Sequence, residues 1–221
     1  MPGVSEIQCI VRTSLPVRGK RMELYAFDYS IQDCDEPEVV ALVNGYRRTN
    51  EESAIVRIHS TCFTGDILGS EKCDCGPQLE YALDAIARAP WGILIYLAQQ
   101  EGRGIGLVRK LQTYVLQDEG FDTATANEEL HAPIDGRDYV IAVEALRYLQ
   151  VKRLWLLSNS PDKISVLRSR GIRIEGVQRL PVRISQFNAA YIESKQARFG
   201  HDFVGGASDK IWSDTWTSMN D

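Results

Sequence analysis

Three cysteines stand close together in the first half of the chain, at a spacing that can bind a metal ion. Cys62, Cys73 and Cys75 lie in one segment that follows an apolar run and contains several glycines. Glycines permit tight turns, so this segment can fold back on itself and bring the three thiols together. Zn²⁺ prefers thiolate ligands, and three protein ligands with an open fourth position are typical of a catalytic zinc site. The spacing therefore favours catalytic zinc.

The spacing alone leaves two other interpretations of this cysteine cluster open. His59 precedes Cys62 by three residues and could supply a fourth ligand, which would close the site and make it structural. The cysteines could also be buried or redox-active thiols without a metal. In the catalytic case, zinc lowers the pKa of a bound water to about 7, and the resulting hydroxide is a nucleophile at neutral pH.

The other cysteines and histidines do not extend the metal pattern. Five cysteines, an odd number without a signal peptide, do not form a typical disulfide framework. Cys9 and Cys34 stand apart from the cluster and are interpreted as ordinary small residues. We expect His131 and His201 to be surface or loop residues outside the site.

The composition of the chain is typical of a globular protein. Its 221 residues are 44% hydrophobic, which is enough for the core of one large domain. No stretch reaches the roughly 18 apolar residues of a membrane span, and the N-terminus lacks the pattern of a signal peptide. The net charge of −5 argues against nucleic-acid binding. We therefore expect a soluble, cytoplasmic protein that binds neither membranes nor nucleic acid.

Strand-like and helix-like segments alternate along most of the chain, as in a mixed α/β domain. Runs of β-branched and apolar residues, separated by turn formers such as Pro16, Gly19 and Asn44-Gly45, predict strands over residues 7–12, 22–28, 39–43, 55–59, 92–97, 151–157 and 172–177. Apolar residues at three- and four-residue spacing predict helices that start near Pro77 and that cover 107–117, 139–149, 161–170 and 188–199. The glycines at 102, 104 and 106 are interpreted as a turn rather than as a dinucleotide-binding fingerprint.

The cysteine segment is the first of several motifs. The stretch Arg-Ile-His-Ser-Thr-Cys-Phe-Thr-Gly-Asp at 57–66, continued by Cys-Asp-Cys-Gly-Pro-Gln-Leu at 73–79, resembles the zinc-binding signature of the GTP cyclohydrolase II family. Later stretches resemble further motifs of that family in the same order, at 100–107, 114–120, 122–123, 135–139 and 158–163. The resemblance covers roughly residues 40 to 200. It implies a mixed (α+β) sheet flanked by helices, with a zinc-binding loop, in a catalytic domain over 1–203, followed by a polar tail over 204–221.

The resemblance also implies a reaction and its cofactors. A hydrolase of this family opens the imidazole ring of GTP at C8, releases that carbon as formate, and releases pyrophosphate, which leaves a diaminopyrimidinone that carries ribose 5-phosphate for riboflavin synthesis. The family's single Zn²⁺ would be bound by Cys62, Cys73 and Cys75. Mg²⁺ would screen the triphosphate. The resemblance further implies a homodimer.

Residue by residue, the resemblance implies three catalytic side chains. Tyr114 would orient water or donate a proton as the ring opens. Asp135 corresponds to the acid/base carboxylate, and Arg137 to an arginine nucleophile. A guanidinium stays protonated up to about pH 12, so Arg137 can equally be a cation that stabilises charge on the α-phosphate, with Asp135 holding it in place.

The resemblance assigns the nucleotide contacts to a larger set. Glu101 would accept hydrogen bonds from N1–H and the amine of guanine, while Arg57, Arg103 and Lys163 would offset the charge of the triphosphate. The complete set is Arg57, His59, Ser60, Thr61, Gln78, Glu101, Gly102, Arg103, Thr123, Ser158 and Lys163.

Several positions depart from the family pattern. Thr61 stands where the family usually has glutamate, Glu71-Lys72 replaces a common Leu-Arg pair, and Leu97-Ala98-Gln99 lacks a customary arginine. Each lost charge-assisted hydrogen bond weakens triphosphate binding by about 1–3 kcal/mol. One alternative is therefore a divergent paralogue that acts on another nucleotide or nucleoside, or that stops at the formamide intermediate. A second alternative is a zinc-stabilised nucleotide-binding protein without turnover.

Overall fold

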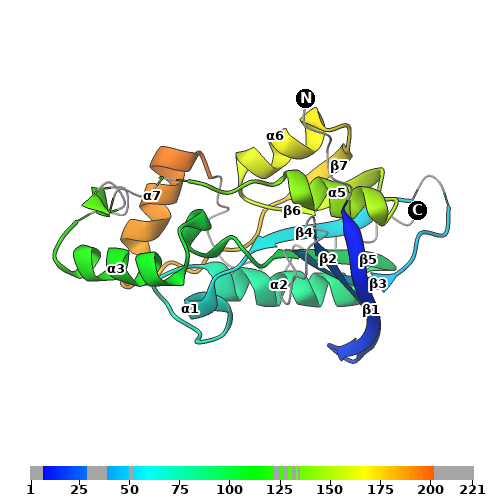
Figure 1. The fold of residues 1–221 in the computed structure, drawn as a ribbon, viewed down its shortest axis with the longest axis horizontal. Helices are drawn as coiled ribbons and strands as arrows, with labels where there is room; N and C mark the ends of the chain where they lie inside the picture. Colours follow the sequence, from blue (N-terminus) through cyan, green and yellow to red (C-terminus); the bar gives the residue numbers. More distant parts are fainter. Residues whose placement is uncertain are drawn as a thin grey trace.

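The computed structural model describes residues 7–28, 39–49, 52–121, 125–126, 129–130, 133 and 135–201. Within these residues the strands are β1 (Gln8–Val17), β2 (Lys20–Asp28), β3 (Val39–Gly45), β4 (Ala54–Ser60), β5 (Trp91–Leu97), β6 (Arg153–Leu157) and β7 (Arg173–Gln178). The helices are α1 (Phe63–Asp66), α2 (Cys75–Arg88), the 3₁₀ helix η1 (Glu101–Gly104), α3 (Leu107–Asp118), α5 (Val140–Tyr148), α6 (Pro161–Ser169) and α7 (Ala189–Phe199). The strands form one sheet in the order β1-β2-β3-β5-β4-β6-β7 (Figure 1).

The sheet has an antiparallel half and a parallel half. β1, β2, β3 and β5 pair antiparallel, whereas β4 pairs parallel with both β5 and β6, and β6 pairs parallel with β7. The β1–β2 hairpin turns at Arg18 and Gly19, whose φ angles of 51° and 70° suit the tight turns of twisted hairpins. Pro16 was expected to form a turn but lies within β1, opposite Arg21. A proline is tolerated there because β1 is an edge strand.

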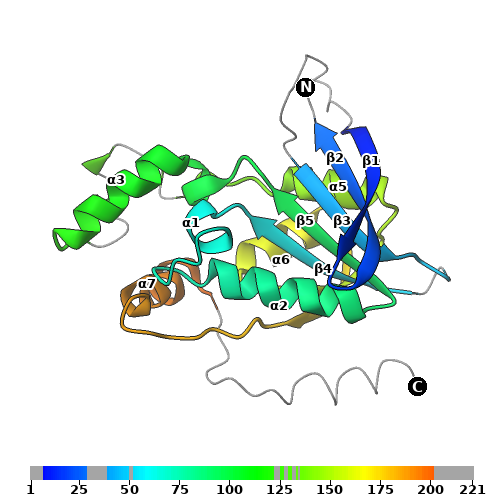
Figure 2. The ribbon, with the colours of Figure 1, turned by 90° about the horizontal axis from the view of Figure 1, so that it is seen from below.

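Helices cover both faces of the central strands (Figure 2). On one face, Ile86 of α2 packs in a cluster with Leu42 and Leu94. On the other face, Val143 and Leu146 of α5 pack in the main core with alternate residues of β4, β5 and β6. Successive strand residues point to opposite faces, so strands that are covered on both sides are apolar along their length. This burial explains why the apolar runs predicted these strands well.

The carboxyl ends of β4, β5 and β6 meet at one edge of the sheet. The cysteine segment and α1 follow β4, η1 and α3 follow β5, and the start of α6 follows β6. Figure 1 places α1, α3 and α7 together beyond this edge. In sheets with parallel strands, ligands bind outside the carboxyl ends of the strands.

The observed architecture is the predicted mixed α/β sheet flanked by helices, and the element ends differ from the predicted ones by a few residues. α2, for example, begins at Cys75 rather than near Pro77. Four expectations concern residues outside the described ranges: those for Cys34, for Thr123, for His131 and for the tail at 204–221. In the described part of the chain, no helix combines the length and the apolar character needed to cross a membrane.

Candidate active site

The three cysteine thiols of the motif come together at this edge of the sheet. The Sγ atoms of Cys62, Cys73 and Cys75 all lie within 4.8 Å of one another, and those of Cys62 and Cys73 are 3.6 Å apart. Cys62 and Cys73 are buried, with 5% and 4% of their surface exposed. Three buried sulfur atoms at this separation are a donor set that suits Zn²⁺.

Two glycines allow the cysteine segment to fold this tightly. A Cβ atom on Gly65 would lie 2.9 Å from the Sγ of Cys73 and 3.1 Å from the Sγ of Cys62. A Cβ on Gly76 would lie 2.4 Å from the carbonyl oxygen of Gly65. Any larger residue would therefore push the two halves of the segment apart.

His59 does not join the cysteine cluster. Its Nε2 lies 3.0 Å from both carboxylate oxygens of Asp66, and its Nδ1 lies 3.3 Å from Nη2 of Arg57. Burial lowers the pKa of His59, so the ring is neutral at pH 7. Nε2–H then donates to Asp66, and Nδ1 accepts from Arg57. Both ring nitrogens are engaged by the protein, so the structure does not support the closed four-ligand site that His59 would complete.

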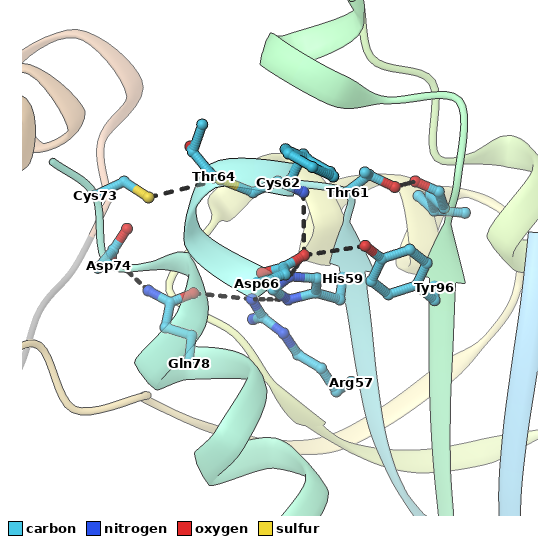
Figure 3. Close-up of polar contacts among 12 residues, drawn as sticks. Arg57, His59, Thr61, Cys62, Thr64, Asp66, Cys73, Asp74, Gln78 and Tyr96 are labelled. Carbon is cyan, nitrogen blue, oxygen red and sulfur yellow. Dashed lines mark hydrogen bonds and ion pairs between the residues drawn. The ribbon is translucent and has the colours of Figure 1, made fainter. Parts of the chain in front are cut away.

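Asp66, which was not among the predicted site residues, accepts hydrogen bonds from several neighbours. Besides His59, it accepts hydrogen bonds from the backbone N–H of Cys62 (3.0 Å) and from the hydroxyl of Tyr96 (3.1 Å), as Figure 3 shows. The Tyr96 ring stacks on the ring of His59. These contacts fix the backbone at Cys62, the first cysteine of the cluster.

The same network reaches the other two cysteines. Arg57 donates to Oε1 of Gln78 (2.8 Å), and Nε2 of Gln78 donates to Oδ2 of Asp74 (2.5 Å) (Figure 3). Asp74 stands between Cys73 and Cys75 in the sequence. Arg57 also donates to the carbonyl oxygen of Leu157 (3.1 Å). Arg57 and Gln78, expected to contact nucleotide, therefore also hold the cysteine segment in place.

A lysine that the sequence reading did not single out also contacts the cluster. Nζ of Lys110 lies 3.1 Å from the Sγ of Cys62 and 2.7 Å from Oε1 of Glu101. Oε2 of Glu101 accepts from the backbone N–H of Phe63 (2.6 Å). Lys110 precedes Tyr114 by four residues on α3, so the two side chains share one face of the helix. This spacing from Tyr114 could have identified Lys110 from the sequence.

Tyr114 lies beside the cysteine cluster. Its hydroxyl is 3.4 Å from Oγ1 of Thr64, which in turn lies 3.7 Å from the Sγ of Cys62. Burial raises the pKa of Tyr114, so its hydroxyl stays protonated at neutral pH. The group can therefore donate a proton next to the thiols.

Asp135 and Arg137 form a bidentate ion pair. Nε of Arg137 lies 2.9 Å from Oδ1 and 3.1 Å from Oδ2 of Asp135, and Nη2 donates to Oδ2 as well. Burial lowers the pKa of Arg137, but the hydrogen bonds and charge of Asp135 more than offset this and raise it above its usual value. For Asp135 the effects have the opposite sign: burial raises its pKa, but the hydrogen bonds and charge of Arg137 lower it overall. The pair is thus a fixed cation and carboxylate at neutral pH.

Three further side chains, Arg57, Arg103 and Lys163, form the cationic group of the site, and its two arginines have incomplete hydrogen bonding. Nε of Arg57 and both Nη atoms of Arg103 are buried without a hydrogen-bond partner. Nζ of Lys163 donates to the carbonyl oxygen of Ile58 (2.8 Å). Burial lowers the pKa of Lys163 well below its usual value, and the charges of Arg57 and Arg137 lower it further. Buried cations of this kind are stabilised by an anion.

One pocket, with an empty volume of about 940 Å³ including its open mouth, is lined by both the thiols and the cationic group. Its described lining has six cationic side chains and one carboxylate, although the whole chain carries a net charge of −5. The lining is Arg57, His59, Ser60, Thr61, Cys62, Cys73, Cys75, Gln78, Gln100, Glu101, Gly102, Arg103, Ile105, Lys110, Thr113, Tyr114, Gln117, Arg137, Ser158, Asn159, Ser160, Lys163, Tyr191, Lys195 and His201. The pocket therefore suits an anionic small molecule.

The pocket brings together most of the residues expected from the sequence. Asp135 is not among its lining residues but holds Arg137, which is. Thr123 lies outside the described residues. His201 was expected to lie outside the site, but it lines the pocket together with Tyr191 and Lys195 of α7. That expectation failed because α7 and the residues that follow it up to His201 lie against the site.

The left-handed backbone of η1 contributes to this arrangement. Gly102 and Arg103 have φ angles of 59° and 64°, a conformation that is unusual for arginine. The guanidinium of Arg103 lies 4.1 Å from the ring centroid of Phe199 in α7. Gly104 and Gly106 also have positive φ angles. The glycines of this segment therefore form a turn, as predicted.

Comparisons with known proteins agree with the motif resemblance. A profile described as GTP cyclohydrolase II matches residues 8–181, which is more than half of the chain. The chain is 43% identical over 196 residues to the riboflavin biosynthesis protein RibBA of Salinispora arenicola, a match that covers 89% of this chain and 46% of the relative. It is 47% identical over 169 residues to RibBA of Bacillus cytotoxicus, covering 76% and 42%.

A plant relative gives the same result. The monofunctional riboflavin biosynthesis protein RIBA 3, chloroplastic, of Arabidopsis thaliana is 38% identical over 204 residues, covering 92% of this chain and 39% of the relative. The chain thus spans less than half of the length of each of these three relatives. The profile match and these identities show that the chain belongs to the GTP cyclohydrolase II family.

Proposed function

We propose that the protein hydrolyses GTP, opening the imidazole ring and releasing formate and pyrophosphate to give 2,5-diamino-6-(5-phosphoribosylamino)pyrimidin-4(3H)-one. The observation that carries the proposal is one pocket lined by a cluster of three thiols and by cations with incomplete hydrogen bonding. Such a pocket suits a molecule with a hydrolysable ring and a polyphosphate. Family membership supports the same reaction.

Cys62, Cys73 and Cys75 would hold one Zn²⁺, since their sulfur atoms are close enough to share an ion. When bound, the ion would supply activated water for attack on C8 and on the formyl carbon. The protonated hydroxyl of Tyr114 is placed to give a proton to the ring nitrogen that leaves C8. Glu101, already bonded to Lys110 and Phe63, would use its remaining lone pairs for the guanine N1–H and amine.

The triphosphate would lie against the cationic group, with Mg²⁺ screening its charge. Arg57 and Arg103 have buried N–H groups without partners, and Lys163 is buried near the like charges of Arg57 and Arg137. Ser158 is buried and lines the same pocket. Phosphate oxygens would complete these hydrogen bonds, which amounts to charge-assisted binding.

Arg137 acts in this proposal as a cation rather than as a nucleophile. Its pKa is raised by the bidentate contact with Asp135, so a neutral guanidine is not accessible near pH 7. A fixed guanidinium beside the α-phosphate would stabilise the charge that develops as pyrophosphate leaves.

The test is incubation of the purified protein with GTP, Zn²⁺ and Mg²⁺, with formate, pyrophosphate and the pyrimidine product followed by mass spectrometry. All three products are expected in equal amounts. Chelation of zinc should abolish their formation while circular dichroism shows the fold retained. Binding of GTP without any product would favour the non-catalytic nucleotide-binding protein instead.

A divergent paralogue is the second candidate, and one contact favours it. Thr61, which replaces a usual glutamate, donates its hydroxyl to the carbonyl oxygen of Leu97 (2.6 Å) and so offers no carboxylate beside Cys62. The same assay with ATP, GDP, GMP and guanosine tests this candidate. Turnover of one of these without turnover of GTP, or accumulation of the formamide intermediate, would decide in its favour.

We further propose that the protein is a homodimer. Val108, Leu111 and Val115 form an apolar stripe on α3 and are 72%, 44% and 60% exposed. Exposed apolar stripes of this kind mark association surfaces. Light scattering coupled to gel filtration should give twice the chain mass of 24.8 kDa, and Val115→Glu should shift the mass towards one chain.

A further inference from the structure

The described C-terminal helix α7 brings a buried lysine to the cysteine segment. Nζ of Lys195 lies 2.5 Å from Oδ1 of Asp74, 121 residues away in the chain. Lys195 is 8% exposed and Asp74 is 2% exposed. The helix lies beyond the residues 8–181 that the family profile matches. Lys195 is therefore part of the site that neither the motifs nor the profile assigns.

Asp74 occupies a position from which it controls the cluster. It separates Cys73 from Cys75, so the direction of its side chain fixes the backbone that carries both thiols. Its two carboxylate oxygens are shared: Oδ1 accepts from Lys195 and Oδ2 accepts from Gln78. A carboxylate with both oxygens held in this way has one orientation available.

Charge makes Lys195 the more important of the two partners. Gln78 is neutral, whereas Lys195 brings a positive charge to a buried carboxylate that stands next to thiol ligands. Without this charge, the buried carboxylate of Asp74 would lose its ion-pair partner while it stands beside thiolates, which it would repel. The segment would then relax away from the geometry that brings the three sulfur atoms together.

Attachment of α7 does not require this ion pair. Ile192 is buried at 2% exposure on the same helix. The guanidinium of Arg103 lies 4.1 Å from the ring centroid of Phe199 and 5.9 Å from that of Tyr191, both on α7. These contacts fasten the helix without Lys195, which leaves the charge of Lys195 available for Asp74.

We propose that Lys195 is a positioning residue for the metal: through Asp74 it holds Cys73 and Cys75 in the metal-binding arrangement. The inference rests on the metal site of the proposed function but not on the identity of the nucleotide. It differs from a direct role in nucleotide binding, which the place of Lys195 in the pocket lining would also permit. The two roles predict different results when zinc affinity is measured without nucleotide, because only the positioning role changes that affinity.

The test measures the zinc affinity of the full chain without nucleotide, by competition with a chromogenic chelator. Lys195→Met is expected to weaken zinc binding by about 10–100-fold, the usual cost of losing a group that supports a metal ligand. Lys195→Arg keeps the charge and should restore most of the affinity. Gln196→Met is the matched control, because Gln196 is the exposed neighbour on the same helix and should leave the affinity unchanged. Thiolate-to-cobalt absorption of Co²⁺-loaded protein should weaken in parallel.

Asp74→Asn gives a second, independent variant. It should weaken zinc binding as well. The double variant Asp74→Asn/Lys195→Met should bind zinc no more weakly than the single variant with the lower affinity, because both changes break the same ion pair. Unchanged zinc affinity in Lys195→Met, with a raised KM for GTP, would overturn the inference in favour of a nucleotide contact. Additive losses in the double variant would overturn it too.

The outcome is separable from that of the proposed reaction. A wild-type protein that binds zinc but does not turn over GTP refutes the proposed reaction, and the affinity comparison still decides the role of Lys195. A wild-type protein that binds no zinc overturns both. Circular dichroism of each metal-free variant shows whether the fold is retained, and if Lys195→Met does not fold, Asp74→Asn decides the question.

Discussion

The thiol cluster and the cationic group of the pocket differ in how fully the polar groups around them are partnered. Around the thiols, the carboxylates of Asp66, Asp74 and Glu101 all receive hydrogen bonds from neighbouring groups. In the cationic group, Arg57 and Arg103 have buried N–H groups without partners. The thiol cluster is therefore organised by the protein itself, whereas the cationic group has hydrogen-bonding capacity left for a ligand. Substitutions in the two groups should separate metal binding and chemistry from nucleotide binding.

The largest effect is expected for Cys73→Ser, which removes one thiol from the cluster. Ring opening, followed as formate, should fall by more than about 100-fold, beyond the usual cost of losing a supporting hydrogen bond. The affinity for GTP, measured by calorimetry, should change little because the residues of the cationic group are untouched. Cys9→Ser is the matched control, since Cys9 lies on the edge strand β1 away from the cluster. Normal ring opening by Cys73→Ser would remove the metal from the proposal.

Arg137→Ala should have the next largest effect, and on a different product. Pyrophosphate release should fall by about 100- to 1,000-fold, the usual loss when a group that stabilises developing charge is removed. Zinc content should stay at the wild-type level, because Arg137 contacts Asp135 rather than the thiols. Arg12→Ala, which breaks an exposed ion pair with Glu23, is the control. Undiminished pyrophosphate release would contradict the role given to Arg137.

Lys163→Met tests whether the cationic group is stabilised by its ligand. Affinity for GTP should weaken by about 10- to 100-fold, as expected for one charge-assisted hydrogen bond of about 1.5–3 kcal/mol. The thermal midpoint of the nucleotide-free protein should not fall, because the substitution removes a buried cation whose pKa is lowered by burial and by its neighbours. A large fall in that midpoint, with GTP affinity kept, would show that Lys163 is a structural residue instead.

The smallest effect concerns pH and the ion pair of Asp135. Its pKa is lowered overall by Arg137, so the pair contributes stability above the ordinary aspartate pKa of 3.8 and loses it as pH falls through the lower folded value. The free energy of unfolding should therefore decline more steeply below about pH 4 in the wild type than in Asp135→Asn. Urea titrations across that range measure the difference. Identical slopes would mean that the pair contributes no stability.

The fold and the thiol cluster were largely predictable because their signals are local. Strands buried on both faces are continuous apolar runs, and these gave β4 and β5 to within one residue at either end. The three cysteines lie within fourteen positions of one another, and glycines mark the turns between them. Local patterns of this kind do not depend on how distant parts of the chain meet.

The partners of the cluster were not predictable because they come from distant segments. Lys195 meets Asp74 across 121 residues, and no pattern in either segment indicates the other. His201 looked like a surface residue for the same reason, since its place depends on how α7 folds back. Asp66 lies within the motif at 57–66, but an aspartate near a metal loop resembles a solvated turn residue until its hydrogen bonds are known.

The sequence separations between the pocket residues also set the order in which their contacts form during synthesis. All three cysteines leave the ribosome within one short stretch, whereas the contact of Lys163 with Ile58 spans 105 residues and that of Lys195 spans 121. Contacts between distant segments form only after the later segment has been made, and their loop-closure cost delays them further. A nascent chain therefore presents three thiols long before it has a nucleotide site. During that interval, early capture of a metal would protect the thiols from oxidation.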